Sequence, residues 1–337
     1  MGRRVFLLGL SFLIISFNAF CDDASKDELI KKLSEKVEQL EKKVDDLSTK
    51  LGVYEKSNGV SEEVVDKKVS DALAKKEKEE PAFLKSLQGT ALSGYVDTSY
   101  TYNFNSPNSG VNTARVFDNK DNSFMLQSAK IALEKLPSTE DRVGFRTDVI
   151  FGHDAKIIKP YGWNTDDVNL EQAYIDALFP LGKGLDVKAG KFVTMHGAEV
   201  IESKDNWNFS RSLLFGYAIP FTHTGIRASY PLLNNLSGYF GVNNGWDDIE
   251  DNNTSRSFET GLAYAPSDKT SLNLNYMFGP EYENNNHSNR NLIDFVATYK
   301  PFEKLTLKVN TDYGFEDNLN GAYGIGGDSG YWSGVAG

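Results

Sequence analysis

The stretch GYVDTSYTYNF at residues 94–104 decides the fold, because its side chains alternate in character from one residue to the next. Apolar side chains at positions 96, 100, 102 and 104 fall on one face of an extended chain, and polar side chains at positions 97, 99, 101 and 103 fall on the other. This period of two is typical of a β-strand with one apolar face, whereas a helix repeats every 3.6 residues. The stretch therefore predicts a β-sheet protein.

The same alternation recurs along the rest of the chain. It is clearest at residues 142–152, 272–278 and 305–313, where aliphatic and aromatic residues alternate with Arg, Asp, Lys and Asn. Clusters of Asn, Asp, Gly and Pro bound the segments, as expected for turns and loops. We count about eleven such strands, and a twelfth begins at Tyr331.

Two architectures fit such strands, a secreted β-sandwich and a transmembrane β-barrel. Strands in globular proteins usually have about five or six residues, whereas those predicted here run for about nine to eleven. Lipid offers backbone groups no hydrogen-bond partner, so extended chain crosses a membrane only as a closed ladder of strands. We therefore predict an all-β, antiparallel transmembrane barrel, with apolar side chains towards lipid and charged side chains towards a wet lumen.

Composition excludes several other classes of protein. The chain has 337 residues, with 36 Lys and Arg against 47 Asp and Glu, so its net charge is −11. An acidic chain has no electrostatic reason to bind nucleic acid. A single cysteine, Cys21, excludes an internal disulfide, and four scattered histidines leave little for a zinc site. We expect no metal, no cofactor, no catalytic residues and no enzymatic activity.

Residues 1–21 are typical of a secretory signal peptide. Arg3 and Arg4 precede an apolar run over residues 5–17, and the small residues Ala19 and Cys21 suit cleavage after position 21. The alternative is a lipoprotein that keeps a lipidated Cys21. Both routes export the protein, and the predicted barrel then places it in the cell outer membrane.

Residues 22–59 are predicted to form a coiled coil. Their apolar residues follow one another in alternating steps of three and four, which is a heptad seam, and a lone amphipathic helix would need a wider apolar face. We expect this periplasmic segment to make a homo-oligomer, a dimer or a trimer, or to tether the protein to an envelope partner. Residues 60–87 are a helical, charged linker. The seam consists of Ile30, Leu33, Val37, Leu40, Val44, Leu47, Leu51 and Tyr54.

Several short runs after residue 88 form a recognisable series. The runs are LSGYVDTSYTYNF at 92–104, FMLQSAK at 124–130, LEQAY at 170–174, AGKF at 189–192, and NFSRS at 208–212 followed by Pro220, His223, Thr224, Gly225 and Arg227. In their order and spacing they resemble the OmpL-like β-barrel porin-2 family of outer-membrane proteins. The resemblance implies a channel for small hydrophilic solutes, without naming a solute.

The end of the chain departs from that family's pattern. Outer-membrane barrels usually finish on a complete strand with a terminal aromatic residue, but this sequence stops at Gly337, partway through a predicted strand. Bacterial barrels also close with an even number of strands. We therefore expect residues 88–337 to form a barrel that is incomplete at its C-terminus, with an open or strained sheet.

The long segment between Phe192 and Arg211 carries both signs of charge. In porins such a segment can fold into the lumen, where opposite charges create a transverse field. We predict that it forms a constriction together with the barrel wall; the alternative is an exposed loop with solvated charges. The predicted residues are Glu199, Glu202, Lys204, Asp205 and Arg211 on the segment, and Arg146, Asp148, Lys188, Lys191 and Arg227 on the wall.

Three functions remain open from the sequence. The first is a porin for passive diffusion of small hydrophilic solutes, surrounded by outer-membrane lipids and weakly cation-preferring. The second is a structural or adhesive anchor with a plugged barrel. The third is a barrel hydrolase that uses His223 as a base beside a Ser or Asp. The acidic residues 247–253 either bind Ca²⁺ or bridge lipopolysaccharide through divalent ions, or they are an ordinary outer loop.

Overall fold

The computed structural model describes residue 42 and residues 89–317 and 329–337. The predicted signal peptide, the coiled-coil seam and the linker at residues 60–87 lie outside these described residues. The chain divides into two units, Met1–Ser86 and Leu87–Gly337, and the described strands belong to the second.

Twelve β-strands follow one another in the described residues, which confirms the predicted series. Two short α-helices, α5 (His153–Ile157) and α6 (Leu213–Tyr217), and the 3₁₀ helix η2 (Ser203–Asp205) lie in the loops. The strands are β1 (Ala91–Thr101), β2 (Ser123–Lys135), β3 (Val143–Phe151), β4 (Val168–Phe179), β5 (Leu185–Val193), β6 (Thr222–Leu233), β7 (Leu236–Asn243), β8 (Ser257–Ser267), β9 (Thr270–Pro280), β10 (Asn289–Phe302), β11 (Leu305–Asp317) and β12 (Ser329–Ala336).

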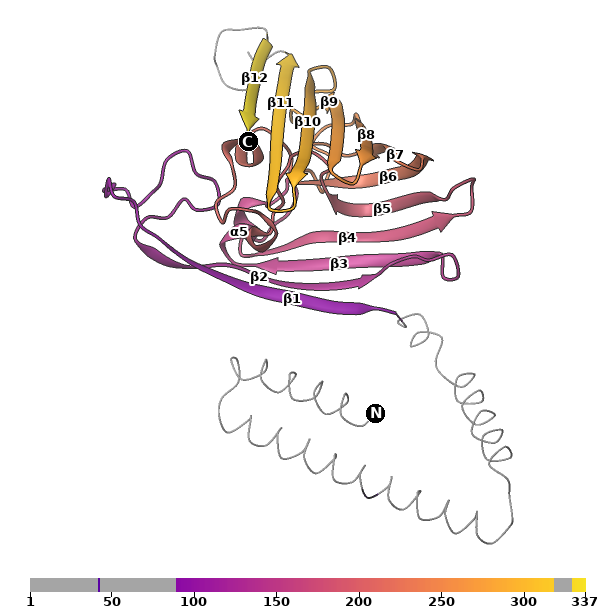
Figure 1. Ribbon diagram of the computed structural model, residues 1–337. Coiled ribbons are helices and arrows are strands. Elements are labelled where there is room, and N and C mark those ends of the chain that lie inside the picture. Colours follow the sequence, from indigo (N-terminus) through magenta and orange to yellow (C-terminus); the bar gives the residue numbers. More distant parts are fainter. Residues whose placement is uncertain (1–41, 43–88, 318–328) are drawn as a thin grey trace. The chain divides into compact units, whose positions relative to one another are not determined.

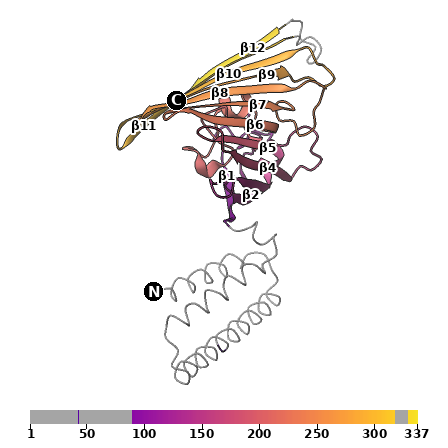
Figure 2. The ribbon, with the colours of Figure 1, turned by 90° about the vertical axis from the view of Figure 1, so that its right-hand side faces the viewer.

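Every strand pairs in antiparallel fashion with the next one along the chain, so the sheet order runs from β1 to β12. This meander confirms the predicted all-β, antiparallel class. Among the described strands, β1 and β12 are not paired with each other, so the sheet is open between them. The sheet curves strongly and has a concave and a convex face (Figures 1 and 2).

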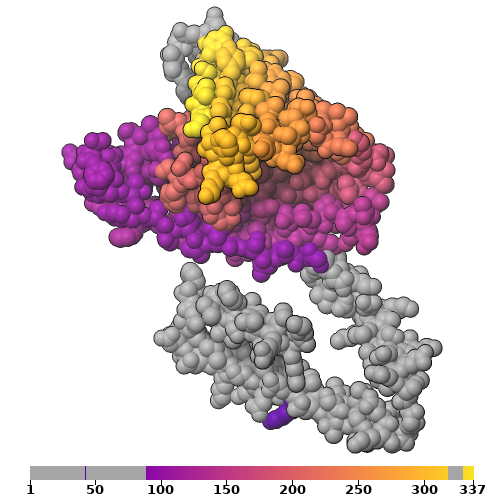
Figure 3. Space-filling view, in the orientation of Figure 1, coloured from indigo at the N-terminus to yellow at the C-terminus, as the bar shows by residue number. Residues whose placement is uncertain are grey.

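The connections differ between the two ends of the sheet. Tight turns join strands at one end, and long loops join them at the other. In the turn after β4, Gly182 and Gly184 have φ values of 56° and 102°, which glycine adopts without strain. The loop after β1 stands out as a purple lobe in Figure 3. The turns are residues 136–142, 180–184, 234–235, 268–269 and 303–304, and the described loops are 102–122, 152–167, 194–221, 244–256 and 281–288.

The alternation in sequence becomes an alternation in exposure. On β11, Leu307 and Val309 are exposed on the convex face, whereas Asn310 and Asp312 are buried on the concave face. A water-soluble sheet buries its apolar face, so an apolar outside and a polar inside indicate lipid around the sheet. Within the described residues, the helices are too short or too polar to cross a membrane.

One apolar cluster lies on the concave side, among the long loops. Phe117 contacts Phe215 and Phe221, with ring centroids 5.9 and 5.7 Å apart. Ile150 of β3 and Leu292 of β10 are fully buried in the same cluster. The cluster therefore joins the loops to one another and to the inner surface of the sheet.

Candidate functional site

The loop at residues 194–221, here called the inner loop, folds onto the concave face of the sheet. It leaves β5 after Val193, returns as β6 at Thr222, and carries η2 and α6. Ser212 caps α6, because its Oγ accepts a hydrogen bond from the N–H of Phe215 at 3.2 Å. Contacts with strands on both sides of the interior hold the inner loop in place.

On one side, β9, β10 and β11 hold the beginning of the inner loop. The N–H of Gly197 donates to both carboxylate oxygens of Asp294, each at 3.0 Å. The N–H of Ala198 donates to Asn310 Oδ1 at 3.1 Å, and Asn275 Nδ2 donates to a carbonyl of the same segment at 2.9 Å. These bonds fix the loop backbone against inward positions of three neighbouring strands.

On the other side, Lys130 of β2 holds the inner loop. Its ammonium lies 2.8 Å from Asp148 Oδ2 on β3 and 2.9 Å from Glu171 Oε1 on β4, and it also pairs with Glu202 of the inner loop. These three carboxylates are the one group in the described part of the chain that is close enough to hold a metal ion. Lys130 already supplies a cation among them, which favours an ion-pair network over a metal site.

Arg211 fixes the second half of the inner loop in the interior. Its guanidinium donates to Asp154 Oδ2 at 2.8 Å and to the carbonyl of Ile201, and it lies 4.1 Å from the centre of the Phe117 ring. The side chains of Arg211 and Asp154 are both 1% exposed. Burial raises the pKa of Asp154 to about 6, although the neighbouring Arg211 acts against the rise. The pair joins the inner loop to α5 and to the apolar cluster.

A cavity of about 370 Å³ lies between the inner loop and strands β3 to β6. Cations from the sheet and carboxylates from the inner loop line it from its two sides, which creates a field across it. The cations are those of Arg146, Lys188 and Arg227, and the carboxylates are those of Glu199, Glu202 and Asp205.

The sheet cations of this cavity have carboxylate partners on the sheet itself. Arg146 and Arg227 form ion pairs at 2.9 and 2.8 Å. Lys188 is held less closely, with its Nζ 3.8 Å from Asp176 Oδ2 and 5.0 Å from the centre of the Tyr174 ring. Lys188 and Arg227 also lie directly opposite each other on β5 and β6. Like charges in such a pair repel, so the carboxylate partners stabilise this part of the wall.

The other four predicted constriction residues lie away from this cavity. Lys191 is buried in the sheet, where its Nζ donates to the carbonyl of Leu170 at 2.7 Å. Arg211 is enclosed with Asp154, and Asp148 is fully buried within the network around Lys130. Lys204 is half exposed and pairs with its neighbour in sequence at 2.6 Å.

Sequence reasoning did not single out the sheet residues that position the inner loop. All of them stand at inward positions of strands, and the period of two in the sequence predicts that they face inward. The period does not predict which of the inward-facing residues contact the inner loop. The residues are Lys130, Glu171, Asn275, Asp294 and Asn310.

His223, considered as the base of a hydrolase, is enclosed in the protein. Its Nε2 lies 3.2 Å from Thr194 Oγ1, its Nδ1 lies 3.2 Å from the carbonyl oxygen of Gly245, and the residue is fully buried. Thr194 also bonds His196 Nδ1 at 3.1 Å. Burial lowers the pKa of His196 to about 3, so this ring is neutral. The group fastens the beginning of the inner loop to β6.

The acidic loop at residues 247–253 makes a structural contact through its first carboxylate. Asp247 Oδ1 accepts hydrogen bonds from the N–H groups of Phe221 and Thr222 at 2.7 and 2.8 Å. Burial raises the pKa of Asp247 to about 6. Asp247 therefore fixes the point where the inner loop rejoins the sheet.

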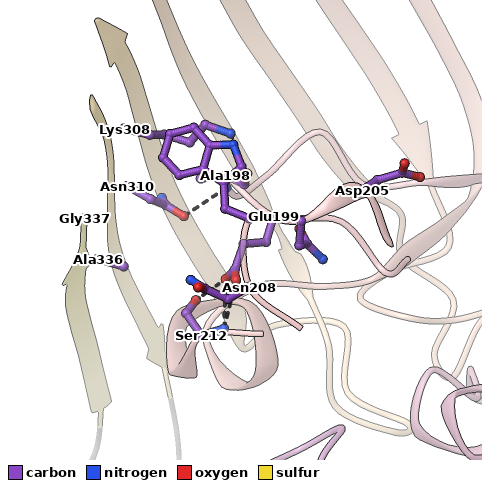
Figure 4. A pocket seen from close by; sticks show the side chains of 11 residues that line it. Ala198, Glu199, Asp205, Asn208, Ser212, Lys308, Asn310, Ala336 and Gly337 are labelled. Atoms are coloured by element: carbon purple, nitrogen blue, oxygen red, sulfur yellow. Dashed lines mark hydrogen bonds between the residues drawn. The ribbon is translucent and has the colours of Figure 1, made fainter. Parts of the chain in front are cut away.

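A second cavity, of about 150 Å³, lies on the opposite side of the inner loop, against β11 and β12 (Figure 4). Glu199 and Asp205 line this cavity as well. Lys308 Nζ donates to the carbonyl of Ala198 at 3.3 Å and lies 4.9 Å from the centre of the Trp207 ring. The carboxylate of Glu199 thus borders a space on each side of the loop.

Comparison with known proteins identifies a family and finds solved structures of an outer membrane protein. The family described as "Putative beta-barrel porin-2, OmpL-like" matches residues 89–337. No curated protein matches the chain. A loop L8 deletion mutant of OmpT, an outer membrane protein of Vibrio cholerae, is 14% identical, with 74% of this chain and 88% of that chain covered and a TM-score of 0.35. In-vitro folded OmpT from the same organism, in a trimer form, is 13% identical, with 74% and 84% covered and a TM-score of 0.35.

Proposed function

This chain belongs to the putative beta-barrel porin-2, OmpL-like family, and we propose that it is an outer-membrane porin through which small hydrophilic solutes diffuse passively. The observation that carries the proposal is the inner loop, which crosses the concave face and sets three carboxylates opposite three cations around one cavity. Opposed charges of this kind orient a passing dipole and narrow the path for it.

The rest of the concave face supports a wet interior. Asp148, Glu259 and Asp294 point inward from β3, β8 and β10, and ionisable groups at this density need water or counter-charges. The convex face carries exposed apolar side chains such as Leu307 and Val309, which suit contact with outer-membrane lipids.

We propose a weak preference of the channel for cations. Arg146 is shared by two carboxylates, since it pairs with Asp148 at 2.9 Å and with Glu134 at 3.1 Å. Glu199 of the inner loop, by contrast, forms no salt bridge among the described residues. The acidic groups therefore leave an excess of negative charge along the path.

The N-terminal segment belongs to the same proposal. As a periplasmic coiled coil, residues 22–59 would assemble the protein into a dimer or a trimer, or tether it to another envelope component. Cleavage after Cys21 or lipidation of Cys21 would both deliver the chain to the envelope.

A structural anchor is the second candidate function. The apolar cluster around Phe117, Phe215 and Phe221 favours it, because loops that pack this closely can plug a barrel. A barrel hydrolase has less support, since His223 is fully buried, and we propose no enzymatic activity and no cofactor.

Conductance of the refolded full-length protein in a planar bilayer tests the proposal. We expect stable current steps and a reversal potential in a KCl gradient that favours K⁺. The double variant Glu202→Ala, Asp205→Ala should move that potential towards Cl⁻. The matched variant Asp268→Ala, Glu303→Ala changes two exposed acids in the tight turns and should leave it unchanged. Silence from protein with the heat-modifiable gel mobility of a folded barrel would favour the anchor.

A further inference from the structure

We propose that the cavity beside the inner loop selects small organic cations that carry an apolar group. Glu199 sets the preference for positive charge, and Met195 and Val200 set the preference for an apolar body. This inference rests on the proposed porin function and adds to it a class of solute.

Among the described residues, Glu199 is the inner-loop carboxylate of the cavity that forms no salt bridge. Its oxygens accept hydrogen bonds from Ser212, from the N–H at 2.9 and 3.1 Å and from the hydroxyl. Of the other two loop acids, Glu202 pairs with Lys130, and Asp205 pairs with the neighbouring lysine at 2.6 Å. Neutral donors orient the Glu199 carboxylate without cancelling its charge, so a cation that enters the cavity finds an oriented partner there.

The sheet side of the cavity is less suited to a solute's anionic group. Arg227 gives two hydrogen bonds to Glu259, at 2.8 and 2.9 Å, and Arg146 is held by two carboxylates of its own. Lys188 faces Asp176 at 3.8 Å. An anionic group would have to compete with the carboxylate that already lies beside each of these cations. The negative charge of Glu199, by contrast, is available to attract a positive solute.

Two of the exposed apolar side chains of the inner loop border this cavity. Met195 is 46% exposed and Val200 is 43% exposed, and both line the cavity. The buried rings of Phe192 and Phe221 continue the same lining. Large apolar side chains left accessible beside charged groups give an apolar solute a surface to contact, whereas a hydrated inorganic ion gains nothing from them.

The arrangement brings the two kinds of contact together. Met195, Glu199 and Val200 come from one short stretch of the inner loop, which Gly197 and Ala198 fix to the sheet. The cavity volume of about 370 Å³ falls within the range of about 300–1,000 Å³ that is typical of small-molecule sites. A solute with an ammonium head and a compact ring or branched chain can use both contacts at once.

The test uses the full-length protein in planar bilayers with permanently charged permeants. Tetramethylammonium and benzyltrimethylammonium have similar heads, and only the second carries an apolar ring. We expect benzyltrimethylammonium to permeate at least as fast as the smaller tetramethylammonium, and both to permeate faster than benzenesulfonate. Permeability ratios come from reversal potentials with a different salt on each side of the membrane.

Variants separate the two preferences. Met195→Ser with Val200→Ser should lower the permeability of benzyltrimethylammonium relative to tetramethylammonium about threefold and keep the preference for cations over benzenesulfonate. Glu199→Gln, which can still accept hydrogen bonds from Ser212, should lower the cation preference about threefold and keep the ratio of the two cations. Asp268→Asn, in the turn between β8 and β9, should leave both ratios unchanged.

The outcomes distinguish this inference from the function on which it rests. Current steps with wild-type permeabilities that follow ion size would overturn the solute class and leave the porin standing. The same conclusion would follow if the Met195→Ser, Val200→Ser variant, folded by its gel mobility, kept the wild-type ratio of the two cations. Folded protein that passes no current would overturn the porin itself.

Discussion

The two sides of the sheet hold the inner loop by different chemistry. On the β2–β4 side, Lys130 binds the side chain of Glu202 together with two sheet carboxylates. On the β9–β11 side, Asp294 and Asn310 bind backbone N–H groups of the loop. A contact through the backbone does not depend on the loop's side chains. The contact through Glu202 does, because the carboxylate that holds the loop in place is also one of the charges that line the cavity. The loop can therefore be fixed on one side and carry selectivity on the other.

The two sides also differ in their balance of charge. On the first side, the cations Lys130 and Arg146 each pair with carboxylates of the same strands. On the second side, Asp294 and Asp312 lie directly opposite each other on β10 and β11, fully buried, and none of the salt bridges in the described residues includes either of them. Asp294 and Asp312 therefore rely on amide and backbone donors, and they are sensitive to the loss of those donors.

The largest expected effect is on the charged side. Lys130→Met leaves three carboxylates close together without their common cation, and removing one partner of a buried ion pair costs about 3–5 kcal/mol. We expect the free energy of unfolding in urea to fall by that amount and the inner loop to become mobile, seen as noise in the channel current. Lys300→Met, an exposed lysine at the turn end of β10, is the matched control. Equal stability of the two variants would show that Lys130 does not hold this side together.

The next effect concerns the backbone contacts of the second side. Asp294→Ala removes the acceptor of the Gly197 N–H and of the amide donors of Asn275 and Asn310. Leaving buried donors without an acceptor costs about 1–3 kcal/mol, so this variant should be less destabilised than Lys130→Met. Urea unfolding measures both on one scale, and the reverse order would contradict the contrast between the two sides.

The sheet follows from the sequence because the period of two is local. In β1, the apolar positions 96 and 100 are exposed and the polar position 97 is half-buried inside, as the pattern at residues 94–104 predicts. A strand's neighbours in a meander are the next strands in the chain, so antiparallel order also follows. The strands could therefore be predicted without knowing which residues far apart in the sequence contact each other.

The site was less predictable, because its contacts are distant in the sequence. Charge predicted that residues around Glu199 and Glu202 would face cations of the wall, and the structure places Arg146, Lys188 and Arg227 around the same cavity. Burial separated Lys191 and Arg211 from the cavity. Lys191, for example, is drawn into the sheet by carbonyl and amide oxygens that only the folded register supplies.

A smaller effect tests the repulsion between the two opposed acids. Asp312→Asn removes one of two like charges that face each other, and it keeps an oxygen for the hydrogen bond from Asn310 Nδ2. Such pairs contribute about 0.2–1 kcal/mol, so we expect a slight gain in stability. Asp317→Asn, at the exposed end of the same strand, is the control. A loss of more than about 1 kcal/mol would show that the charge of Asp312 is needed where it is.

The smallest expected effect concerns a pair of acids outside the strands. Like Asp294 and Asp312, these two acids are buried close to each other. Asp248 and Glu281 are both mostly buried and flank Gly245, whose φ of 148° and missing side chain leave room for their oxygens. Burial, and then the neighbouring Glu281, raises the pKa of Asp248 to about 8, and burial raises the pKa of Glu281 to about 7. Because these folded-state values exceed the unfolded ones of about 4, their stabilising contribution is complete below pH 4 and is lost as the pH rises through 7 to 8.

Tryptic cleavage after Arg256 measures this local loss, since Arg256 lies at the end of the loop that contains Asp248. We expect the wild type to be cleaved about as fast as Asp248→Asn at pH 6.5 and about threefold faster at pH 9, where both acids are ionised and repel each other. Comparing the two proteins at the same pH removes the pH dependence of trypsin. Glu303→Gln, in a tight turn, should follow the wild type at both pH values. A constant ratio across this range would mean that the two neighbouring buried acids are tolerated in the long loops, and that the sensitivity inferred for Asp294 and Asp312 does not extend to them.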